Sequence, residues 1–259
     1  MVRAVLTLLL LVLAAAAPPR VEIIGRPVAG CIIGAVRLPD DAPGLQTIRA
    51  SRSSFWGAPV LIAALEDLGR RVRAAGLPDL YVGDLAARHG GPLAGGHAAH
   101  QIGLEADVYL DLAPRPPLTS EARDALVPPG LVRPDGMAVD PARWTAAEVT
   151  LLRLAATLPG IDRILVNPVI KRRLCETVTG DRSWLRLIRP WWGHTSHMHI
   201  RLRCPPGQTL CVEGPPPPPG DGCDATLDWW FAERTHPRPP PPRRPPPPLP
   251  AACRAVLGE

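Results

Sequence analysis

Lysine is almost missing from this chain of 259 residues, since Lys171 is the only one. Pro168 stands three positions before it, so a Ser-x-x-Lys nucleophile motif does not exist here. No His-Glu-x-x-His sequence occurs either, which excludes the commonest zinc-protease helix. The chain has no Cys-x-x-Cys pair, so disulfides are favoured over a thiolate metal site.

Long hydrophobic runs are also absent, apart from one short run near the N-terminus. Residues 8–17 are apolar, Arg3 gives a positive start, and two prolines follow at once. Such a run is too short to span a bilayer comfortably, and its small residues suit signal peptidase. We therefore expect residues 1–17 to be a cleaved signal peptide and the exported chain not to insert into a membrane.

The charge of the chain is +5, and nearly all the positive charge is arginine. The arginines are scattered and accompany no nucleic-acid motif, so we expect no nucleic-acid partner. The positive balance fits a protein that works near an anionic polymer.

Six cysteines remain after export, and an even number in an exported chain favours three disulfides. Cys204 and Cys211 enclose only six residues and are placed to close a small loop. Six cysteines permit fifteen pairings, and their spacing does not choose among them.

Proline divides the mature chain into two regions. Seventeen of the 35 prolines lie between Pro205 and Pro250, where runs of proline favour extended polyproline II. Cys223, Cys253 and the aromatic group Trp229–Phe231 lie in the C-terminal region 205–259. We therefore expect a globular domain at 18–204 and, at 205–259, a Pro-rich extended strap fastened to it by disulfides.

The globular region mixes helices and strands without regular alternation. Apolar spacing predicts a helix over 60–72 that Gly76 ends, and Thr145 with Glu148 forms a capping-box pattern before a second helix. Shorter helices are expected at 169–175 and 183–188, and strands at 80–82, 104–110, 164–166 and 198–203. The pattern predicts one α+β domain with a central antiparallel sheet flanked by helices.

Five of the seven histidines fall in two short windows, 95–107 and 191–201, whereas His89 and His236 lie elsewhere and are expected to be surface residues. In the second window, strand alternation turns Met198, Ile200 and Leu202 to the core. The opposite face then carries four polar residues: His197, His199, Arg201 and Arg203.

In the first window Glu105, Asp107 and Tyr109 share one strand face, with His100 just before it and Gly103 at the turn. Histidine and carboxylate ligands from these windows suit Zn²⁺, and three protein ligands leave a position for water, as catalytic sites do. The alternative is that these are ordinary core or surface histidines. Spacing alone does not say which histidine of the His197/His199 pair binds metal.

The combination of His100-x-x-Gly-x-x-x-Asp107 with His197-x-His199 resembles the signature of lysostaphin-type, D-alanyl-D-alanine and hedgehog-like metallopeptidases. The longer strings GGHAAHQ (95–101) and HMHIRLRCP (197–205) resemble the penicillin-insensitive murein endopeptidases. The turn at 221–223 and the Pro-rich end share this likeness, which covers residues from about 31 to 253.

The resemblance implies zinc bound by His100, Asp107 and His199. It implies that His197 takes a proton from the attacking water or stabilises the tetrahedral intermediate, and that His194 supports the site. His97 matches a histidine that the family associates with metal. The alternative, equally open, is that His97 lies behind the ligands and does not bind the metal itself.

The resemblance also implies the disulfides Cys31–Cys253, Cys175–Cys223 and Cys204–Cys211. Relatives can carry an Asp-x-x-His pair for another metal ion. Here Asp135 is present, but Ala138 stands where the histidine would be. An auxiliary metal is therefore not expected there.

The function implied by the resemblance is zinc-dependent, penicillin-insensitive hydrolysis of D-alanyl–meso-diaminopimelate cross-links in periplasmic peptidoglycan. Two alternatives stay open: a D,D-carboxypeptidase or dipeptidase that trims stem peptides, and a non-catalytic wall-binding module that keeps the metal. Trp191 and Trp192 either line a cleft or pack in the core.

Overall fold

A computed structural model of the protein describes residues 20–94, 97–114, 116, 118–235 and 245–258. The expected signal peptide, the first two glycines of the GGHAAHQ string and His236 lie outside these ranges. In the part of the chain that is described, no helix is long and apolar enough to cross a membrane.

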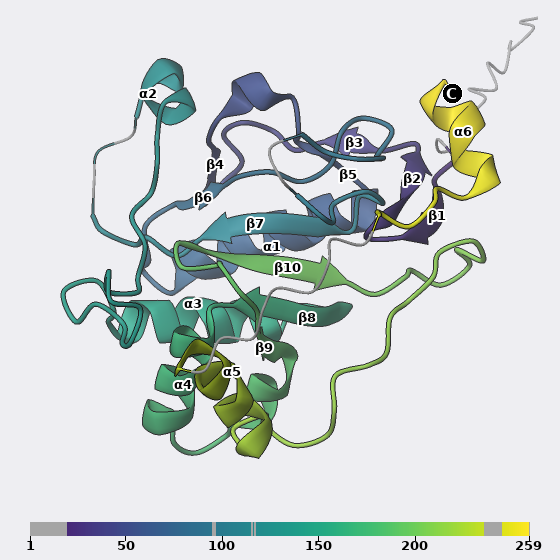
Figure 1. Ribbon diagram of the computed structural model, residues 1–259. Helices are drawn as coiled ribbons and strands as arrows, with labels where there is room; N and C mark the ends of the chain where they lie inside the picture. Colours follow the sequence, from purple (N-terminus) through teal and green to yellow (C-terminus); the bar gives the residue numbers. More distant parts are fainter. Residues whose placement is uncertain (1–19, 95–96, 115, 117, 236–244, 259) are drawn as a thin grey trace, which may run out of the picture.

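A six-stranded sheet forms the centre of the molecule (Figure 1). Its strands, in order across the sheet, are β4 (Leu45–Thr47), β6 (Leu80–Val82), β7 (Glu105–Tyr109), β10 (His197–Leu202), β8 (Ile161–Val166) and β9 (Ile188–Pro190). The central pairs are antiparallel, as the sequence predicts, whereas the outer pairs β4–β6 and β8–β9 are parallel. The chain between each parallel pair contains a helix, because parallel neighbours need a long crossover.

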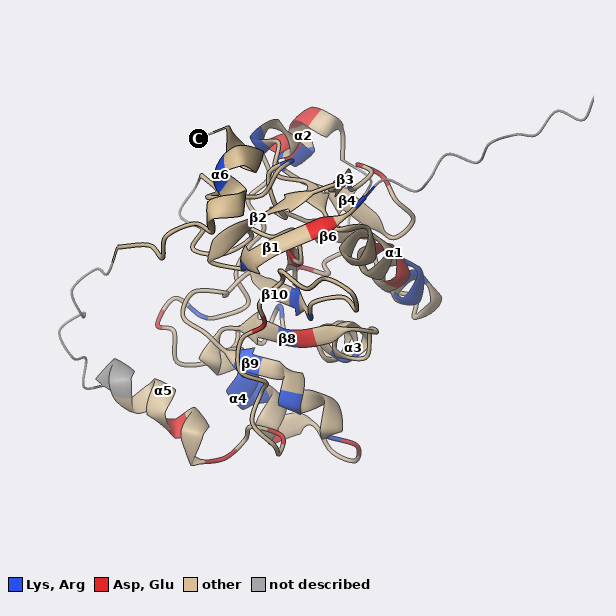
Figure 2. Cartoon of the chain, turned by 90° about the vertical axis from the view of Figure 1, so that its right-hand side faces the viewer, with Lys and Arg blue, Asp and Glu red and all other residues tan. Residues whose placement is uncertain are grey.

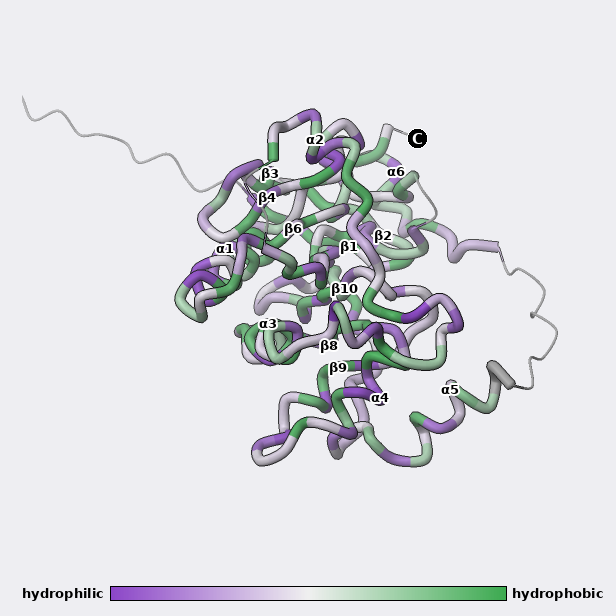
Figure 3. The backbone as a smooth tube through the Cα atoms, turned by 90° about the vertical axis from the view of Figure 1, so that its left-hand side faces the viewer, coloured by the Kyte–Doolittle hydropathy of each residue, from purple (hydrophilic) through white to green (hydrophobic). Residues whose placement is uncertain are grey.

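Two helices, α1 (Pro59–Ala74) and α3 (Ala146–Ala156), lie together on one side of the sheet (Figures 1 and 3). The apolar stripe of α1 is buried, and Gly76 follows its end with a positive φ of 72°. The predicted capping box of Thr145 and Glu148 starts α3. Met198 and Ile200 of β10 are buried in the hydrophobic core, so the opposite face of the strand is left for the polar residues.

The other predicted elements are present with shifted ends. The helix expected at 169–175 is α4 (Pro168–Thr177), while the segment Ser183–Leu187 forms a 3-10 helix. Several short elements were not predicted: the hairpin β1 (Glu22–Arg26) and β2 (Ala29–Ile33), the pair β3 (Val36–Arg37) and β5 (Trp56–Gly57), the 3-10 helix Ala50–Arg52, and α2 (Ser120–Asp124).

The C-terminal region, expected as an extended Pro-rich strap, also contains two helices. It contains α5 (Ala225–Thr235) and α6 (Ala251–Leu257). Both helices begin after a proline-rich stretch and contain no proline, so nothing in their backbone prevents helical hydrogen bonding.

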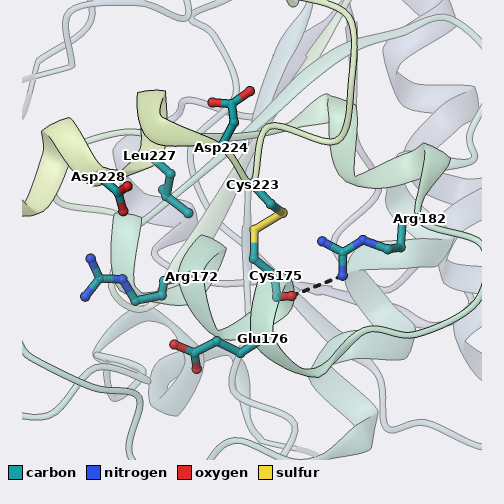
Figure 4. A pocket seen from close by; sticks show the side chains of 8 residues that line it. All are labelled: Arg172, Cys175, Glu176, Arg182, Cys223, Asp224, Leu227 and Asp228. Carbon is teal, nitrogen blue, oxygen red and sulfur yellow. Dashed lines mark hydrogen bonds between the residues drawn. A yellow bond between two sulfur atoms is a disulfide. The ribbon is translucent and has the colours of Figure 1, made fainter.

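All three expected disulfides are confirmed. Cys31–Cys253 joins β2 to α6, and Cys204–Cys211 closes the small loop after β10. Cys175–Cys223, drawn in Figure 4, joins α4 to the segment before α5, and both cysteines line a hollow of about 410 Å³. The guanidinium of Arg182 donates to the carbonyl of Cys175 beside this bond. The C-terminal region is therefore fastened to the domain at both ends.

Candidate metal centre

The two histidine windows meet on the face of the sheet opposite α1 and α3. In the antiparallel ladder of β7 and β10, Asp107 pairs with His199, and Tyr109 pairs with His197. Direct partners across a ladder point to the same face, so the predicted alternation places these side chains together. Arg203 lies beyond the end of β10 and is exposed, unlike the three polar residues before it.

The carboxylate of Asp107 is the centre of the cluster. Its Oδ1 lies 3.2 Å from Nδ1 of His199, 3.4 Å from Nε2 of His100 and 3.8 Å from Nε2 of His197, and its Oδ2 lies 3.9 Å from Nδ1 of His97. Ligand atoms of His97, His100 and Asp107 all lie within 4.8 Å of one another. The structure therefore brings together all four residues predicted to bind metal.

The hydrogen bonding of the cluster fits a cation-binding site. Nδ1 of His100 and Oδ1 of Asp107 are buried and have no hydrogen-bond partner in the described structure. Buried polar atoms without partners are rare in proteins and call for an unseen group. Nitrogen and carboxylate donors together are the set that Zn²⁺ prefers, so these residues fit a zinc ion.

Glu105 orients His199 from behind, and this role was missed by the reading of the sequence. Its Oε1 lies 2.9 Å from Nε2 of His199 and accepts from Nε of Arg201 at 2.6 Å, while Oε2 accepts from the backbone N–H of His100 at 2.6 Å. Because a carboxylate only accepts, Nε2 of His199 carries a proton and Nδ1 is left free toward Asp107. The sequence did contain a signal for this role, because Glu105 lies on the same strand face as Asp107.

The charges in this network hold one another ionised. Burial alone would raise the pKa of Glu105, but His199 and Arg201 outweigh it and hold that pKa well below its usual range. Burial alone would also raise the pKa of Asp107, and His100 and His199 bring it well below the ordinary value. The metal-free cluster is thus arranged around two carboxylates that stay negative at neutral pH.

A second buried carboxylate, Asp84, orients His97 in the same way. Its Oδ2 lies 3.0 Å from Nε2 of His97, and it also accepts from Ser54 and Arg52. These bonds outweigh burial and bring the pKa of Asp84 down to about 2. Nδ1 of His97 is therefore left facing Asp107, as a ligand nitrogen would be.

His194 and His197 lie beside the cluster with ring centroids 5.0 Å apart. Nδ1 of His194 donates to the carbonyl of Trp192 at 2.8 Å, which leaves Nε2 as its basic nitrogen. Burial lowers the pKa of His194 to about 4, and burial also lowers the pKa of His197, opposed by Asp107. Both rings are therefore neutral near pH 7, so each has one nitrogen without a proton.

The backbone is strained at two of these histidines. His100 has a φ of 70° and His194 a φ of 50°, values that residues other than glycine seldom adopt. Gly103 also has a positive φ, and a Cβ there would come within 3.1 Å of the backbone nitrogen of Ala58, as expected of the turn before β7. Backbone strain of this kind gathers at functional sites.

The cluster opens into a cleft of about 850 Å³. Trp191 and Trp192 line it and are 52% and 43% exposed, so they are not core residues. Trp230 of α5 packs against both, with its ring centroid 4.9 Å from that of Trp192. Pro215–Pro218 form another part of the wall, so the C-terminal region shapes the cleft.

Two further residues of the sequence analysis lie away from the cleft. His89 is exposed, as expected of a surface residue. Asp135 sits in a turn where its carboxylate pairs with Arg133 at 3.0 Å, and the backbone carbonyl of Ala138 accepts from the N–H of Arg133.

Comparison with known proteins agrees with the geometry. The profile of the family described as penicillin-insensitive murein endopeptidase matches residues 23–258. A protein of that name from Haemophilus influenzae is 45% identical over 211 residues, which are 80% of this chain and 72% of the relative. Relatives of the same name from Klebsiella pneumoniae subsp. pneumoniae and Salmonella newport are each 40% identical, over 89% and 93% of this chain and 84% and 88% of their own length. The chain therefore belongs to the penicillin-insensitive murein endopeptidase family.

Proposed function

We propose that this protein is a zinc-dependent endopeptidase that hydrolyses D-alanyl–meso-diaminopimelate cross-links of peptidoglycan in the periplasm. The observation that carries the proposal is the buried cluster around Asp107, with unpartnered ligand atoms at the base of a large cleft. The names of the relatives supply the murein substrate. Three disulfides support an oxidising compartment outside the cytoplasm.

We assign the metal ligands to His97, His100, Asp107 and His199. His97 and His199 present Nδ1 because Asp84 and Glu105 occupy their other nitrogens. Some catalytic zinc sites expand to five ligands, so four protein groups would be compatible with a reacting water. When bound, zinc polarises the scissile carbonyl and lowers the pKa of water toward neutrality.

We assign proton transfer to His197, supported by His194. His197 is neutral near pH 7, and its Nε2 faces the cluster, so that nitrogen accepts the proton of the attacking water and returns it to the leaving amine. The hydrogen bond from Nδ1 of His194 to the Trp192 carbonyl fixes the position of Nε2, which assists His197 when the tetrahedral intermediate forms. The indoles of Trp191 and Trp192 and the proline wall line the cleft beside these two histidines.

The test is digestion of purified, cross-linked muropeptide dimers by the zinc-loaded protein. We expect release of monomers that a chelator abolishes and penicillin leaves unchanged, because the chain has no Ser-x-x-Lys nucleophile. Loss of terminal alanine alone would instead identify a carboxypeptidase. Metal binding and wall binding without any cleavage would identify a non-catalytic module.

A further inference from the structure

A row of four side chains runs across the sheet from the metal cluster to its edge. Asp107 of β7 pairs with His199 of β10, His199 pairs with Leu165 of β8, and Leu165 pairs with Arg189 of β9. Paired residues share a face, so Arg189 lies on the same face as the cluster. Two strand spacings, about 10 Å, separate the backbones of Arg189 and His199.

Arg189 differs from the other arginines that line the cleft. Arg163 is paired with Asp162 at 2.6 Å, and Arg201 is paired with Glu105 at 2.6 Å. Arg189 lines the same cleft and is half-buried, but no acceptor or carboxylate partners it among the residues that the structure describes. A guanidinium removed from water in this way normally has an anionic partner.

Burial and the charges around Arg189 favour an anion beside its guanidinium. Burial lowers its pKa, the nearby Arg163 lowers it further, and only Asp224, which is exposed, acts in the opposite direction. Figure 2 shows basic residues on both β9 and the adjoining α4. The ammonium of Lys171, on α4, donates to backbone carbonyls and supplies no negative charge.

The C-terminal region is fitted closely around this guanidinium. A Cβ at Gly222 would lie 2.7 Å from Nη1 of Arg189, so the turn there depends on glycine. The carbonyls of Pro217 and Pro218 accept from Arg186 at 2.7 and 2.9 Å, which holds the proline wall in place. The arginine is therefore enclosed by the fold on one side and open to the cleft on the other.

We propose that Arg189 binds the carboxylate next to the scissile bond of the cross-linked peptide, a specificity contact that rests on the proposed endopeptidase function. Diaminopimelate has two amino-acid centres, each with an amine and a carboxyl group. In the proposed cross-link one amine is acylated by alanine, so the carboxyl on that same carbon is free. A guanidinium can hold such a carboxylate through two parallel hydrogen bonds and fix the position of the leaving amine.

The experiment compares three dimers: the native one, one amidated at the carboxyl beside the scissile bond, and one amidated at the free diaminopimelate carboxyl of the other stem peptide. Binding is measured on chelator-treated protein and kcat/KM on zinc-loaded protein, for wild type, Arg189→Gln, Arg189→Lys and Arg186→Gln. We expect amidation beside the scissile bond to weaken wild-type binding about 10- to 100-fold. The substitution Arg189→Gln should weaken binding of the native dimer by the same factor. Amidation beside the scissile bond should then weaken binding by this variant no further.

The controls separate this contact from a structural role. Arg189→Lys keeps the charge but not the paired hydrogen bonds, so it should retain part of the discrimination. Arg186→Gln loosens the proline wall and should change binding of all three dimers by the same factor. The proposal is overturned if Arg189→Gln still discriminates as wild type does, or if only amidation of the other carboxyl matters. If zinc-loaded wild type cleaves no dimer, the proposed function fails, and the binding assay still decides the role of Arg189.

Discussion

At the scale of single residues, the site is organised by oxygen atoms that fix the proton on three of its imidazoles. Asp84 holds His97, Glu105 holds His199, and the Trp192 carbonyl holds His194. Each contact leaves one chosen nitrogen free, either toward Asp107 or as a base. Residues that bind neither metal nor substrate therefore decide what the histidines can do.

Replacing Glu105 with Gln should weaken zinc binding about 10- to 100-fold, because the amide cannot match the charge that holds His199. The measurement is competition for zinc against a chelator of known affinity. Glu176→Gln, on an exposed side chain paired with Arg173, is the matched control and should leave zinc affinity unchanged. Equal zinc affinity in Glu105→Gln and wild type would contradict the orienting role.

Replacing His197 with Ala should leave zinc content unchanged and reduce kcat about 10²- to 10⁴-fold, because the proton acceptor is lost while the ligands remain. Elemental analysis of the purified protein and muropeptide cleavage give the two values. A variant that loses its zinc would show that His197 is a ligand. A variant that keeps full activity would remove it from proton transfer.

At the scale of elements, local signals set where helices begin, and sheet pairing sets which strands meet. The helix α3 starts where Thr145 accepts from the N–H of Ala147 and Glu148 bonds back to the N–H of Thr145. Such reciprocal bonds satisfy N–H groups that the first turn of a helix leaves unpaired. The ladder of β7 and β10 depends on segments about 90 residues apart, which no local signal specifies.

Replacing Thr145 with Ala should lower the free energy of unfolding by about 1 kcal/mol, since the cap hydrogen bond is lost. Urea unfolding followed by circular dichroism measures the change. Thr150→Ala is the comparison: this half-buried residue bonds to the Ala146 carbonyl within the helix, and its removal should cost less. Equal losses for the two variants would argue against the capping box.

At the scale of the whole molecule, a buried lysine and a disulfide fasten the C-terminal region to the domain. Nζ of Lys171 donates to the carbonyls of Leu185 and Asp221 at 2.8 and 2.5 Å, close to the Cys175–Cys223 bond. Burial, together with Arg189, lowers the pKa of this amine to about 7. The only lysine of the chain thus joins helix α4 to the region that walls the cleft.

The lowered pKa predicts a pH dependence of stability. Between pH 7 and about 10.5 the unfolded chain keeps the proton of Lys171 while the folded chain releases it, so stability rises with pH in this window. The difference in unfolding free energy between wild type and Lys171→Met should grow by up to about 1.4 kcal/mol per pH unit. Urea unfolding at pH 7, 8 and 9 measures it. A difference in unfolding free energy that is constant with pH would show that the amine of Lys171 does not titrate with a lowered pKa.

The sequence by itself determined the parts of the site that depend on local periodicity. Alternation along each strand put His197 and His199 on one face of their strand and Asp107 with Glu105 on one face of theirs, because successive strand side chains point to opposite sides. The same local logic located the capping box of α3 and the turn at Gly103. The pairing of the cysteines came from family resemblance, since spacing permitted fifteen arrangements.

Only the tertiary structure decided which atoms meet. The register of β10 with β7 brings His199 against Asp107, and the register of β8 with β9 puts Arg189 in the same row. These pairings join segments far apart in the chain, so they depend on packing of the whole core rather than on neighbouring residues. For the same reason, the roles of Asp84 and Glu105 and the helices of the C-terminal region appear only once the chain is folded.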